Sequence, residues 1–387
     1  MLRQSTRTRL FGRRRAPLVA PIQAIVVARR GLSEPPLSPP VVYHHHHNPS
    51  LIQTSSIHSK RKQQPSPLNP TAAKMSSQQQ KTQAELTGEF EKEIKRNPHG
   101  NFKQVEAARP PWEPAASPRY TQTAQPSWTF GTGANNLPSP SPLPKSISID
   151  PYADGRSPGL NYKLLISAIT PRPIALLSTR SPDGTIQNLA PFSYFNVISH
   201  DPPLFIIGFV GAASNPSCKD SLRNMLESKE CVINIISEGI IEAANSTSIN
   251  APYGVSEWDV SGLTPVYDCE TVSNLPRVKE AVFSIEGKLE SSREFESRAV
   301  PGRMGTTLVV IEGTRFWARE DALDAEGGLL KTDVLRPMGR MGGITYSRQI
   351  ETIELPRPDF ERDLGGHEGL AKIKEKRAKE NGEEVLN

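Results

Sequence analysis

Two short segments of the sequence place polar groups where a predicted strand ends or is interrupted, a position from which they can contact a small molecule. In residues 171–179 (PRPIALLST), the hydroxyls of Ser178 and Thr179 stand at the end of a strand. In residues 188–196 (NLAPFSYFN), Pro191 removes one donor from the ladder and leaves neighbouring amides free to face a ligand. Each segment also has a structural interpretation: a core strand for the first, and an edge strand with an aromatic plug for the second.

A third segment, residues 215–221 (NPSCKDS), has the composition of a phosphate site. It opens a predicted helix over 217–228 that Ser217 would cap, and the amides at a helix N-terminus attract anions. Lys219 adds a positive charge at the same place. The alternative is an ordinary helix cap beside a solvated lysine, and the segment in isolation supports both interpretations equally.

The chain lacks the motifs of several common catalytic machineries. No GxGxxG follows a strand, no GxxxxGK[ST], HExxH or GxSxG occurs, and the glycine cluster at 339–343 lacks the strand-to-helix context of a phosphate loop. Cys218, Cys231 and Cys269 have no CxxC spacing, which excludes a zinc ribbon and a disulfide scaffold. We expect no metal site and assign no catalytic residue, so any chemistry is borrowed from a cofactor.

The elements that must position these segments are short apolar strands. Their β-branched and aromatic residues, and the turn residues between them, are typical of a sheet, and an Asp-Gly turn at 181–184 predicts a hairpin. Among these strands, helices are expected at 217–228 and around 240–246; residues 82–97 and 372–379 also have helical propensity. Many strands with few helices favour a mainly β fold, a closed barrel rather than a doubly wound sheet. The predicted strands are 174–179, 186–190, 204–210, 231–236, 281–291 and 306–318.

The net charge of +5 arises from the N-terminus. Residues 1–33 contain eight arginines and no acidic residue, which leaves 38 basic against 41 acidic residues in the rest of the chain. A near-neutral domain lacks the positive face that nucleic acid requires, so we expect no nucleic-acid partner. No run reaches the roughly 18 to 20 apolar residues that span a bilayer, so we expect no membrane span.

The N-terminal composition indicates targeting. Residues 1–33 are typical of a mitochondrial presequence, and residues 34–100, rich in Pro, Ser, Gln and His, are expected to be disordered. The alternative is that translation starts at Met75, which would make the protein cytoplasmic. Residues 101–150 are predicted to form an extended arm and a Pro-rich linker, and residues 359–387 a charged tail.

The three segments occur in order with two further motifs, DPP at 201–203 and RMGGITY at 340–346. Together with PRPIA, NLAPFSYF and KDS, these motifs resemble the flavin reductase-like proteins of the FMN-binding split-barrel superfamily. The resemblance covers residues 151–358, and the arm at 101–112 resembles that of fungal members described as flavoprotein oxygenase-like. It implies a split β-barrel, Greek-key-like, with a few short helices.

The resemblance also implies where a cofactor would bind. Main-chain amides from 190 to 193 would hold the isoalloxazine ring, Ser178 and Thr179 would lie near the ribityl chain, and 219–221 would hold the phosphate. Arg340 and Tyr346 match the segment beside the open flavin face, on the nicotinamide side. The implied cofactor-binding residues are Ser178, Thr179, Asn188, Ala190, Pro191, Phe192, Ser193, Tyr194, Asn196, Lys219, Asp220 and Ser221.

The implied activity is that of an FMN-dependent oxidoreductase. NAD(P)H would stack directly on the flavin, which explains the absent Rossmann motif, and the flavin would supply the electron sink. Similar proteins are homodimers. Trp317 departs from the histidine common at that position. Two alternatives remain: a non-catalytic FMN-binding or electron-carrier protein, and an interaction protein with an inactive barrel.

Overall fold

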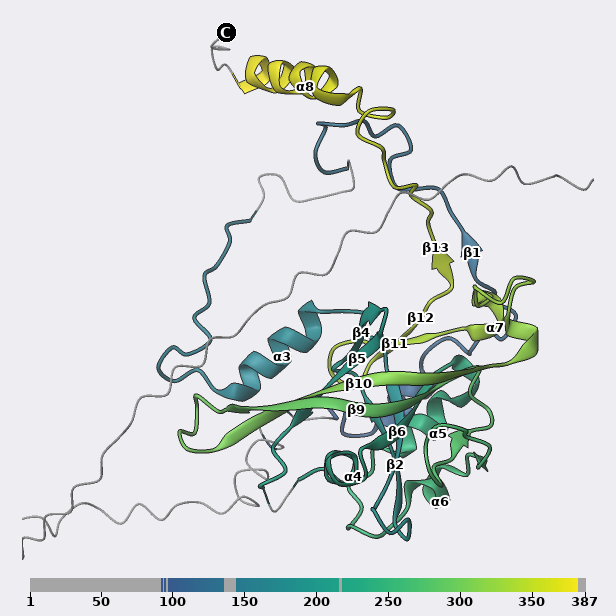
Figure 1. The fold of residues 1–387 in the computed structure, drawn as a ribbon. Helices are drawn as coiled ribbons and strands as arrows, with labels where there is room; N and C mark the ends of the chain where they lie inside the picture. Colours follow the sequence, from purple (N-terminus) through teal and green to yellow (C-terminus); the bar gives the residue numbers. More distant parts are fainter. Residues whose placement is uncertain (1–91, 93, 95–96, 136–143, 216–217, 382–387) are drawn as a thin grey trace, which may run out of the picture. The chain divides into compact units, whose positions relative to one another are not determined.

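The computed structural model describes residues 92, 94, 97–135, 144–215 and 218–381 (Figure 1). The predicted presequence (1–33), nearly all of the predicted disordered region (34–100) and most of the predicted Pro-rich linker lie outside these residues. Predictions for those segments therefore stay predictions.

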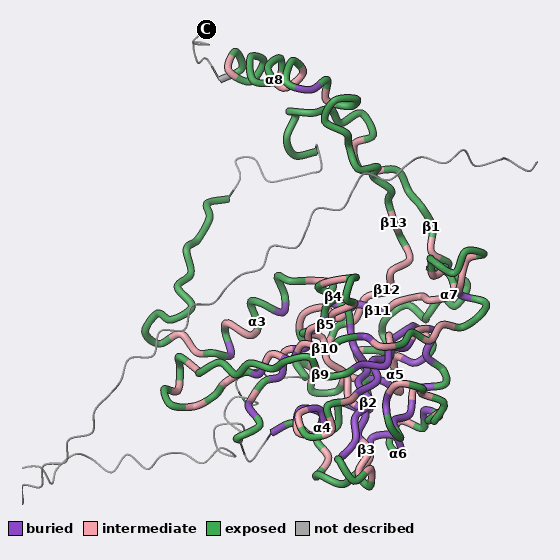
Figure 2. Tube along the Cα trace, in the orientation of Figure 1, coloured by how far each residue is buried: buried purple, intermediate pink, exposed green. Residues whose placement is uncertain are grey.

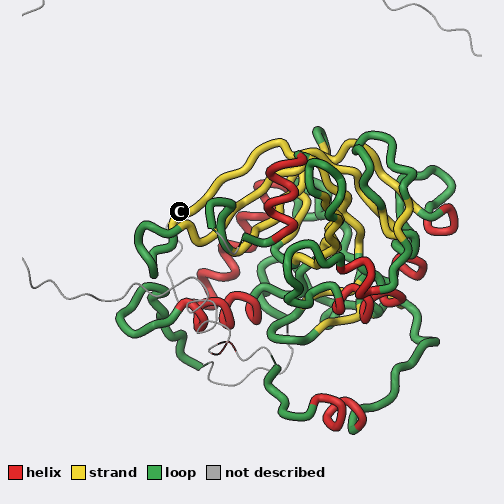
Figure 3. The backbone as a smooth tube through the Cα atoms, turned by 90° about the horizontal axis from the view of Figure 1, so that it is seen from below, coloured by secondary structure: helices red, strands yellow, loops and turns green. Residues whose placement is uncertain are grey.

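A seven-stranded antiparallel sheet forms the centre of the described chain. Its strand order is β3-β2-β6-β9-β10-β5-β4. The strands lie together in one curved wall in the view of Figure 3. The two edge strands, β3 and β4, follow each other in sequence, yet no ladder joins them, so the predicted closed barrel is split at this seam. The strands are β2 (Ala175–Arg180), β3 (Gln187–Phe192), β4 (Phe195–His200), β5 (Pro203–Val210), β6 (Glu230–Ile235), β9 (Phe283–Glu296) and β10 (Met304–Ala318).

The inner face of the sheet encloses an apolar core, because side chains alternate along each strand. In β2, Ala175 and Leu177 point inward to this core. The helix α4 (Asp220–Ser228) packs Leu222 and Met225 against the same core, and Phe209 is its largest fully buried side chain. The interior is therefore filled with apolar side chains rather than open to a ligand.

A second apolar core lies on the outer face. Leu176 of β2 and Leu189 of β3 meet Trp258 there, beneath α5 (Ile241–Ser246) and α6 (Glu257–Ser261). A single helical turn, η1 (Glu238–Ile240), precedes α5. Burial on both faces explains why every residue of β2 is buried, and Figure 2 shows the buried trace around this strand.

Several sequence predictions need correction. The helix predicted over 217–228 begins at Asp220, with Lys219 rather than Ser217 at its N-cap; Ser217 itself lies outside the described residues. The sequence reasoning missed β4, α6 and α3 (Pro158–Ala168). The predicted mainly β class is confirmed, as are the six predicted strands, with boundaries shifted by a few residues.

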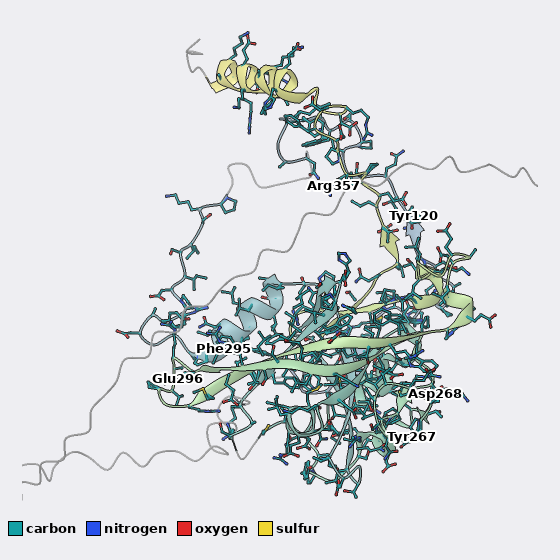
Figure 4. The ribbon with its side chains drawn as sticks, viewed as in Figure 1. Tyr120, Tyr267, Asp268, Phe295, Glu296 and Arg357 are labelled. Atoms are coloured by element: carbon teal, nitrogen blue, oxygen red, sulfur yellow. The ribbon has the colours of Figure 1, made fainter. Side chains whose placement is uncertain are left out.

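The chain on either side of the sheet forms smaller elements. The arm is not simply extended, because it contains the helix α2 (Phe102–Ala107). Its strand β1 (Arg119–Tyr120) pairs in parallel with β13 (Glu351–Thr352), and Figure 4 shows Tyr120 beside β13. The remaining elements are β7 (Pro265–Val266), β8 (Arg277–Val278), η2 (Glu320–Ala322), α7 (Thr332–Leu335), β11 (Met338–Arg340), β12 (Tyr346–Arg348) and α8 (Gly366–Asn381).

Candidate functional site

Ser178 and Thr179, adjacent in sequence, face opposite sides of β2. In the β2–β3 ladder Thr179 lies opposite Asn188, whereas Ser178 lies opposite Leu189 of the outer core. Both hydroxyls are fully buried, and Ser178 Oγ has no hydrogen-bond partner among the residues described. The structure thus separates two hydroxyls that the sequence places together.

Thr179 belongs to a group of five buried polar side chains, which we call the buried network: Thr179, Asn188, Ser221, Asn224 and Glu257. Asn188 Oδ1 accepts from Ser221 Oγ at 2.5 Å and from Thr179 Oγ1 at 3.4 Å. Asn188 Nδ2 donates to Glu257 Oε2 at 2.6 Å, and Asn224 Nδ2 donates to Thr179 Oγ1 at 3.4 Å. These bonds join β2, β3, α4 and α6.

Glu257 is the charged member of the buried network. Burial raises its pKa, and hydrogen bonds from the Leu189 amide and from Asn188 offset only part of that rise. Because the hydroxyl of Ser221 and the amide of Asn188 already have partners inside the protein, these groups hold elements together rather than face solvent.

The start of α4 presents the accessible groups of the KDS motif. Lys219 is exposed, and it forms no ion pair with any residue that the structure describes. The first amides of a helix have no intrahelical acceptor, so those of Asp220 and Ser221 point toward the same end. Burial raises the pKa of Asp220, although the charges of Arg223 and Lys219 oppose the rise. Among the described residues, this helix end therefore combines amides that have no intrahelical acceptor with a lysine that has no ion-pair partner.

Cys218 precedes this helix end but is not activated by it. The thiol is buried, and burial raises its pKa more than the nearby Arg223 lowers it. A helix N-terminus can create a reactive thiolate, but here desolvation dominates. Cys218 therefore behaves as a core residue.

The amides of β3 itself are mostly committed to the sheet. The Leu189 amide donates to Glu257 outside the ladder at 3.2 Å. Since hydrogen-bonded and non-bonded positions alternate in an antiparallel pair, the amides of Ala190 and Phe192 face β2, and Pro191 has none. Phe192 also packs against Phe209, with ring centroids 4.7 Å apart. Accessible groups are thus expected after the strand.

The corner between β3 and β4 supplies those groups. Ser193 is half-buried, whereas Tyr194 and Asn196 are exposed. The Tyr194 carbonyl accepts from the Gly208 amide at 2.8 Å, which fixes the corner to β5. Burial of the phenol raises the pKa of Tyr194, so the hydroxyl stays protonated at neutral pH.

Arg340 and Tyr346 face each other across the β11–β12 hairpin. The Arg340 guanidinium lies 4.4 Å from the centroid of the Tyr346 ring and donates to the Gly343 carbonyl at 2.8 Å. Tyr346 Oη donates to Asn245 Oδ1 at 2.8 Å. A Cβ at Gly342 would lie 3.2 Å from Ser167 of α3, so that glycine permits close packing on α3.

Arg172, part of the PRPIA motif but not assigned a role from the sequence, connects these groups. Its guanidinium donates to the carbonyls of Ile166 and Ile169 at 2.7 Å, and so caps α3. Its backbone exchanges hydrogen bonds with that of Arg340, at 3.0 and 2.9 Å. Arg172 also interacts electrostatically with Tyr194. The available sequence signal was an arginine between two prolines, Pro171 and Pro173, directly before a predicted apolar strand. We call Tyr194, Arg340 and Tyr346 the open cluster.

Trp317, where the family resemblance led us to expect a histidine, has a structural role in this chain. Its Nε1 donates to Glu286 Oε1 at 2.6 Å, and the Arg277 guanidinium lies 4.8 Å from its ring. Glu286 also accepts from the Thr271 amide and hydroxyl, both at 2.6 Å. The tryptophan thus fixes the loop on the outer face of the sheet, near Tyr267 and Asp268 in Figure 4.

The split antiparallel barrel and this motif order define a class of proteins. Residues 167–337 match the model of the flavin reductase like domain. An uncharacterized protein of Halalkalibacterium halodurans is 36% identical over 203 residues, which are 52% of this chain and 93% of that protein. One from Bacillus subtilis is 37% identical over 206 residues, 53% of this chain and 97% of the relative. The chain belongs to the flavin reductase-like family, as its sequence motifs predicted.

A solved structure agrees with this assignment. The crystal structure of nitrilotriacetate monooxygenase component B from Bacillus cereus is 32% identical, with a TM-score of 0.50. The match covers 55% of this chain and all of that one. Within the described residues, no helix is long and apolar enough to cross a membrane, and no cluster of metal-ligating side chains occurs.

Proposed function

We propose that this protein is an FMN-dependent oxidoreductase of the flavin reductase type. A bound flavin would accept hydride from NAD(P)H and pass electrons to an acceptor that remains to be identified. Membership in the flavin reductase-like family carries the proposal. The chain's own residues would bind and orient the two cofactors.

The phosphate end fits one phosphate group. Lys219 and the amides at the start of α4 form a compact cationic and donor-rich end, and Lys219 has no ion-pair partner in the described chain. No second basic or glycine-rich element that would hold an adenylate was found in the sequence. These observations support FMN rather than FAD.

The ring end would lie at the β3–β4 corner, where Ser193, Tyr194 and Asn196 are accessible. Asn188 and Tyr194 are six residues apart, roughly 20 Å along an extended strand, so the corner and the helix end could hold opposite ends of one elongated ligand. Within this proposal the buried residues Ser178, Thr179, Asn188 and Ser221 act indirectly, by fixing β2, β3 and α4. Ala190, Pro191 and Phe192 would form the wall beneath the ring.

The nicotinamide side is proposed to be formed by Arg340 and Tyr346 of the open cluster. Arg340 offers a planar cation that suits phosphate groups. The alternative is that Arg340 only forms a structural ion pair, but no carboxylate pairs with it among the described residues. Its guanidinium rests on Tyr346, which Asn245 holds in place.

A homodimer is also proposed. The helix α3 exposes Leu160, Leu164 and Leu165, and β4 exposes Val197 and Ile198. Apolar surface of this extent favours contact with another chain. Light scattering on the purified protein tests this: a monomer mass at micromolar concentration rejects it.

The proposal is tested on purified protein by its visible spectrum and by chromatography of the released cofactor. We expect bound FMN that loses its colour rapidly when NADH or NADPH is added without oxygen. Flavin that neither nucleotide reduces would favour the electron carrier. Protein that stays colourless after FMN is offered would favour the inactive barrel.

The cellular location is a separate proposal. The arginine-rich residues 1–33 support mitochondrial import. A reporter fused to residues 1–40 should enter mitochondria; diffuse cytoplasmic signal, or a native N-terminus at Met75, contradicts this.

A further inference from the structure

The buried carboxylate of Glu238 connects the chain just before β11 to the last residue of β12, at the open end of the β11–β12 hairpin. Arg336 lies two residues before β11 and Arg348 is the last residue of β12. Arg348 Nε donates to Glu238 Oε1 at 2.8 Å, and Arg336 Nε donates to Glu238 Oε2 at 2.8 Å. The Glu238 side chain is 7% exposed. Both carboxylate oxygens are therefore used to hold the open end of the hairpin.

The opposite end of the hairpin carries the open cluster. The ladder pairs Met338 with Arg348 and then Arg340 with Tyr346. Beyond this point the Arg340 backbone is bonded to Arg172. The hairpin is thus held at one end by Glu238 and at the other by Arg172, three residues before β2, and a shift at Glu238 would be transmitted along two short strands to Arg340 and Tyr346.

The N-terminal arm completes this attachment. The Ala116 carbonyl accepts from Arg336 Nη2 at 2.9 Å and from Arg348 Nη2 at 3.3 Å. The Arg348 guanidinium lies 4.0 Å from the centroid of the Trp112 ring. The same Nη2 groups also donate to Glu238 Oε2, and Arg348 Nη1 donates to the Glu113 carbonyl at 3.3 Å. The arm therefore covers the two arginines and shares their donors with Glu238.

The backbone at Arg336 supports a specific need for its side chain. This residue has φ of 42°, in the left-handed region that residues other than glycine adopt rarely. Glycine would adopt this conformation more easily but could not reach Glu238. The arginine is thus retained at a position whose backbone disfavours it.

The charges remain fixed at neutral pH. Burial alone would raise the pKa of Glu238, but hydrogen bonds from Arg348 and Arg336 and their charges outweigh it, so the pKa lies below its ordinary value. The carboxylate is therefore ionised at neutral pH, and its two arginine partners remain held there.

We propose that Glu238 is a positioning residue for nicotinamide binding: with Arg336, Arg348 and the arm from Trp112 to Ala116, it fixes the hairpin that presents Arg340 and Tyr346. This inference rests on the proposed function of the open cluster. It predicts that the arm, far from the flavin motifs in sequence, controls use of the electron donor without controlling flavin binding.

The test uses full-length Glu238→Gln and Trp112→Ala proteins loaded with FMN. In Glu238→Gln, the side-chain amide N–H would face a guanidinium N–H, so a hydrogen bond to an arginine is lost. Trp112→Ala removes only the indole ring of the arm. We expect half-saturation of anaerobic flavin reduction to need about tenfold more NAD(P)H, with the FMN dissociation constant unchanged within about twofold. Hydrogen exchange of 338–348 should become faster.

Glu351→Gln is the matched control, because it makes the same chemical change in the exposed Arg119–Glu351 pair of the same arm. It should behave as the wild type.

Unchanged hydrogen exchange of 338–348 in both Glu238→Gln and Trp112→Ala would overturn the inference, whatever the kinetics of flavin reduction. Faster exchange with unchanged nucleotide half-saturation would also overturn it, since Glu238 would then be purely structural. A wild type that neither nucleotide reduces rejects the proposed function first, and with it the nucleotide role of Glu238. If Glu238→Gln does not fold, Trp112→Ala decides alone.

Discussion

The buried network and the open cluster differ in what their polar side chains do. Three residues of the buried network, Thr179, Asn188 and Ser221, and all three of the open cluster were predicted from sequence motifs, whereas Asn224 and Glu257 were not predicted. In the buried network, Ser221, Asn188 and Glu257 bond to one another and are closed to solvent. In the open cluster, Tyr194 is 40% exposed and Arg340 has a ring and a carbonyl as partners but no carboxylate among the described residues. The difference shows that one motif combines residues that build the site with residues that can bind.

The alternation of side chains along a strand explains the mixture. Asn188 faces α4, whereas Leu189 faces the outer core. Polar groups of this segment become accessible to solvent only after β3 ends, from Ser193 onward. Adjacent residues of a motif can therefore have unrelated functions, and substitutions at individual positions should separate effects on stability from effects on binding.

The largest expected effect follows from removing Asn188. Asn188→Ala leaves the Glu257 carboxylate buried with one partner fewer and Ser221 without its acceptor, so we expect a loss of about 3 kcal/mol in the free energy of unfolding. Denaturant titration measures it. Asn196→Ala, at an exposed position, should change stability by less than about 0.5 kcal/mol. Equal losses in the two variants would contradict the distinction.

The next effect concerns the accessible lysine at the helix end. Lys219→Ala should weaken FMN binding by about 1.5 to 3 kcal/mol, the range for a hydrogen bond to a charged group, with little change in stability. Fluorescence titration of the flavin measures the affinity. Lys288→Ala, an exposed lysine on β9, is the control. Unchanged FMN affinity, or stoichiometric FAD in the purified protein, would reject the phosphate site.

Arg340→Ala tests the open cluster. FMN should stay bound while flavin reduction needs more NAD(P)H, about tenfold for each 1.4 kcal/mol of lost interaction. Anaerobic stopped-flow reduction measures this, with Arg315→Ala, another partly exposed arginine, as the control. Normal reduction with altered dimer stability would place Arg340 in the structural group and leave the nicotinamide side unassigned.

A smaller effect is expected on the pH dependence of stability. Because burial raises the pKa of Glu257, the folded protein binds this proton more tightly than the unfolded chain does. Its contribution is fully present below the unfolded pKa and is lost as pH rises through the folded pKa. Glu257→Gln should flatten that fall while keeping an acceptor for Asn188. The measurement is the free energy of unfolding as a function of pH. If it changes with pH in the same way in the wild type and the variant, Glu257 does not titrate in this range.

The smallest effect is expected from truncation. A chain that starts at Asn101 lacks mainly residues whose composition cannot form a core. Of the described residues it loses the buried Ile94, but it keeps Trp112 and β1. Its melting temperature and FMN content should match those of the full chain. Loss of soluble protein would show that the removed residues pack on the barrel.

The sequence predicted the strands and the family because apolar alternation and turn residues are local signals. Ile174 to Thr179 and the turn that ends at Gly184 illustrate this. It could not predict that Ser221 is buried, because that depends on Asn188, which is 33 residues from Ser221, and on Glu257, which is 69 residues from Asn188. The role of Arg172 was hidden for the same reason, since its partners lie in α3 and at Met341. The accessible corner at Tyr194 could be predicted from the sequence, because Pro191 lacks an amide donor and so indicates that the strand ladder ends nearby.

The pairing of the arm with the C-terminal segment has a consequence for biosynthesis. Arg119 and Glu351 are 232 residues apart. At about 5 to 20 residues per second, a ribosome needs on the order of 10 to 50 seconds to add the second partner after the first. The sheet strands emerge during that interval and can pair, whereas the arm must wait. The part of the protein proposed to hold flavin can therefore fold before the hairpin is fastened, and the donor side is completed last.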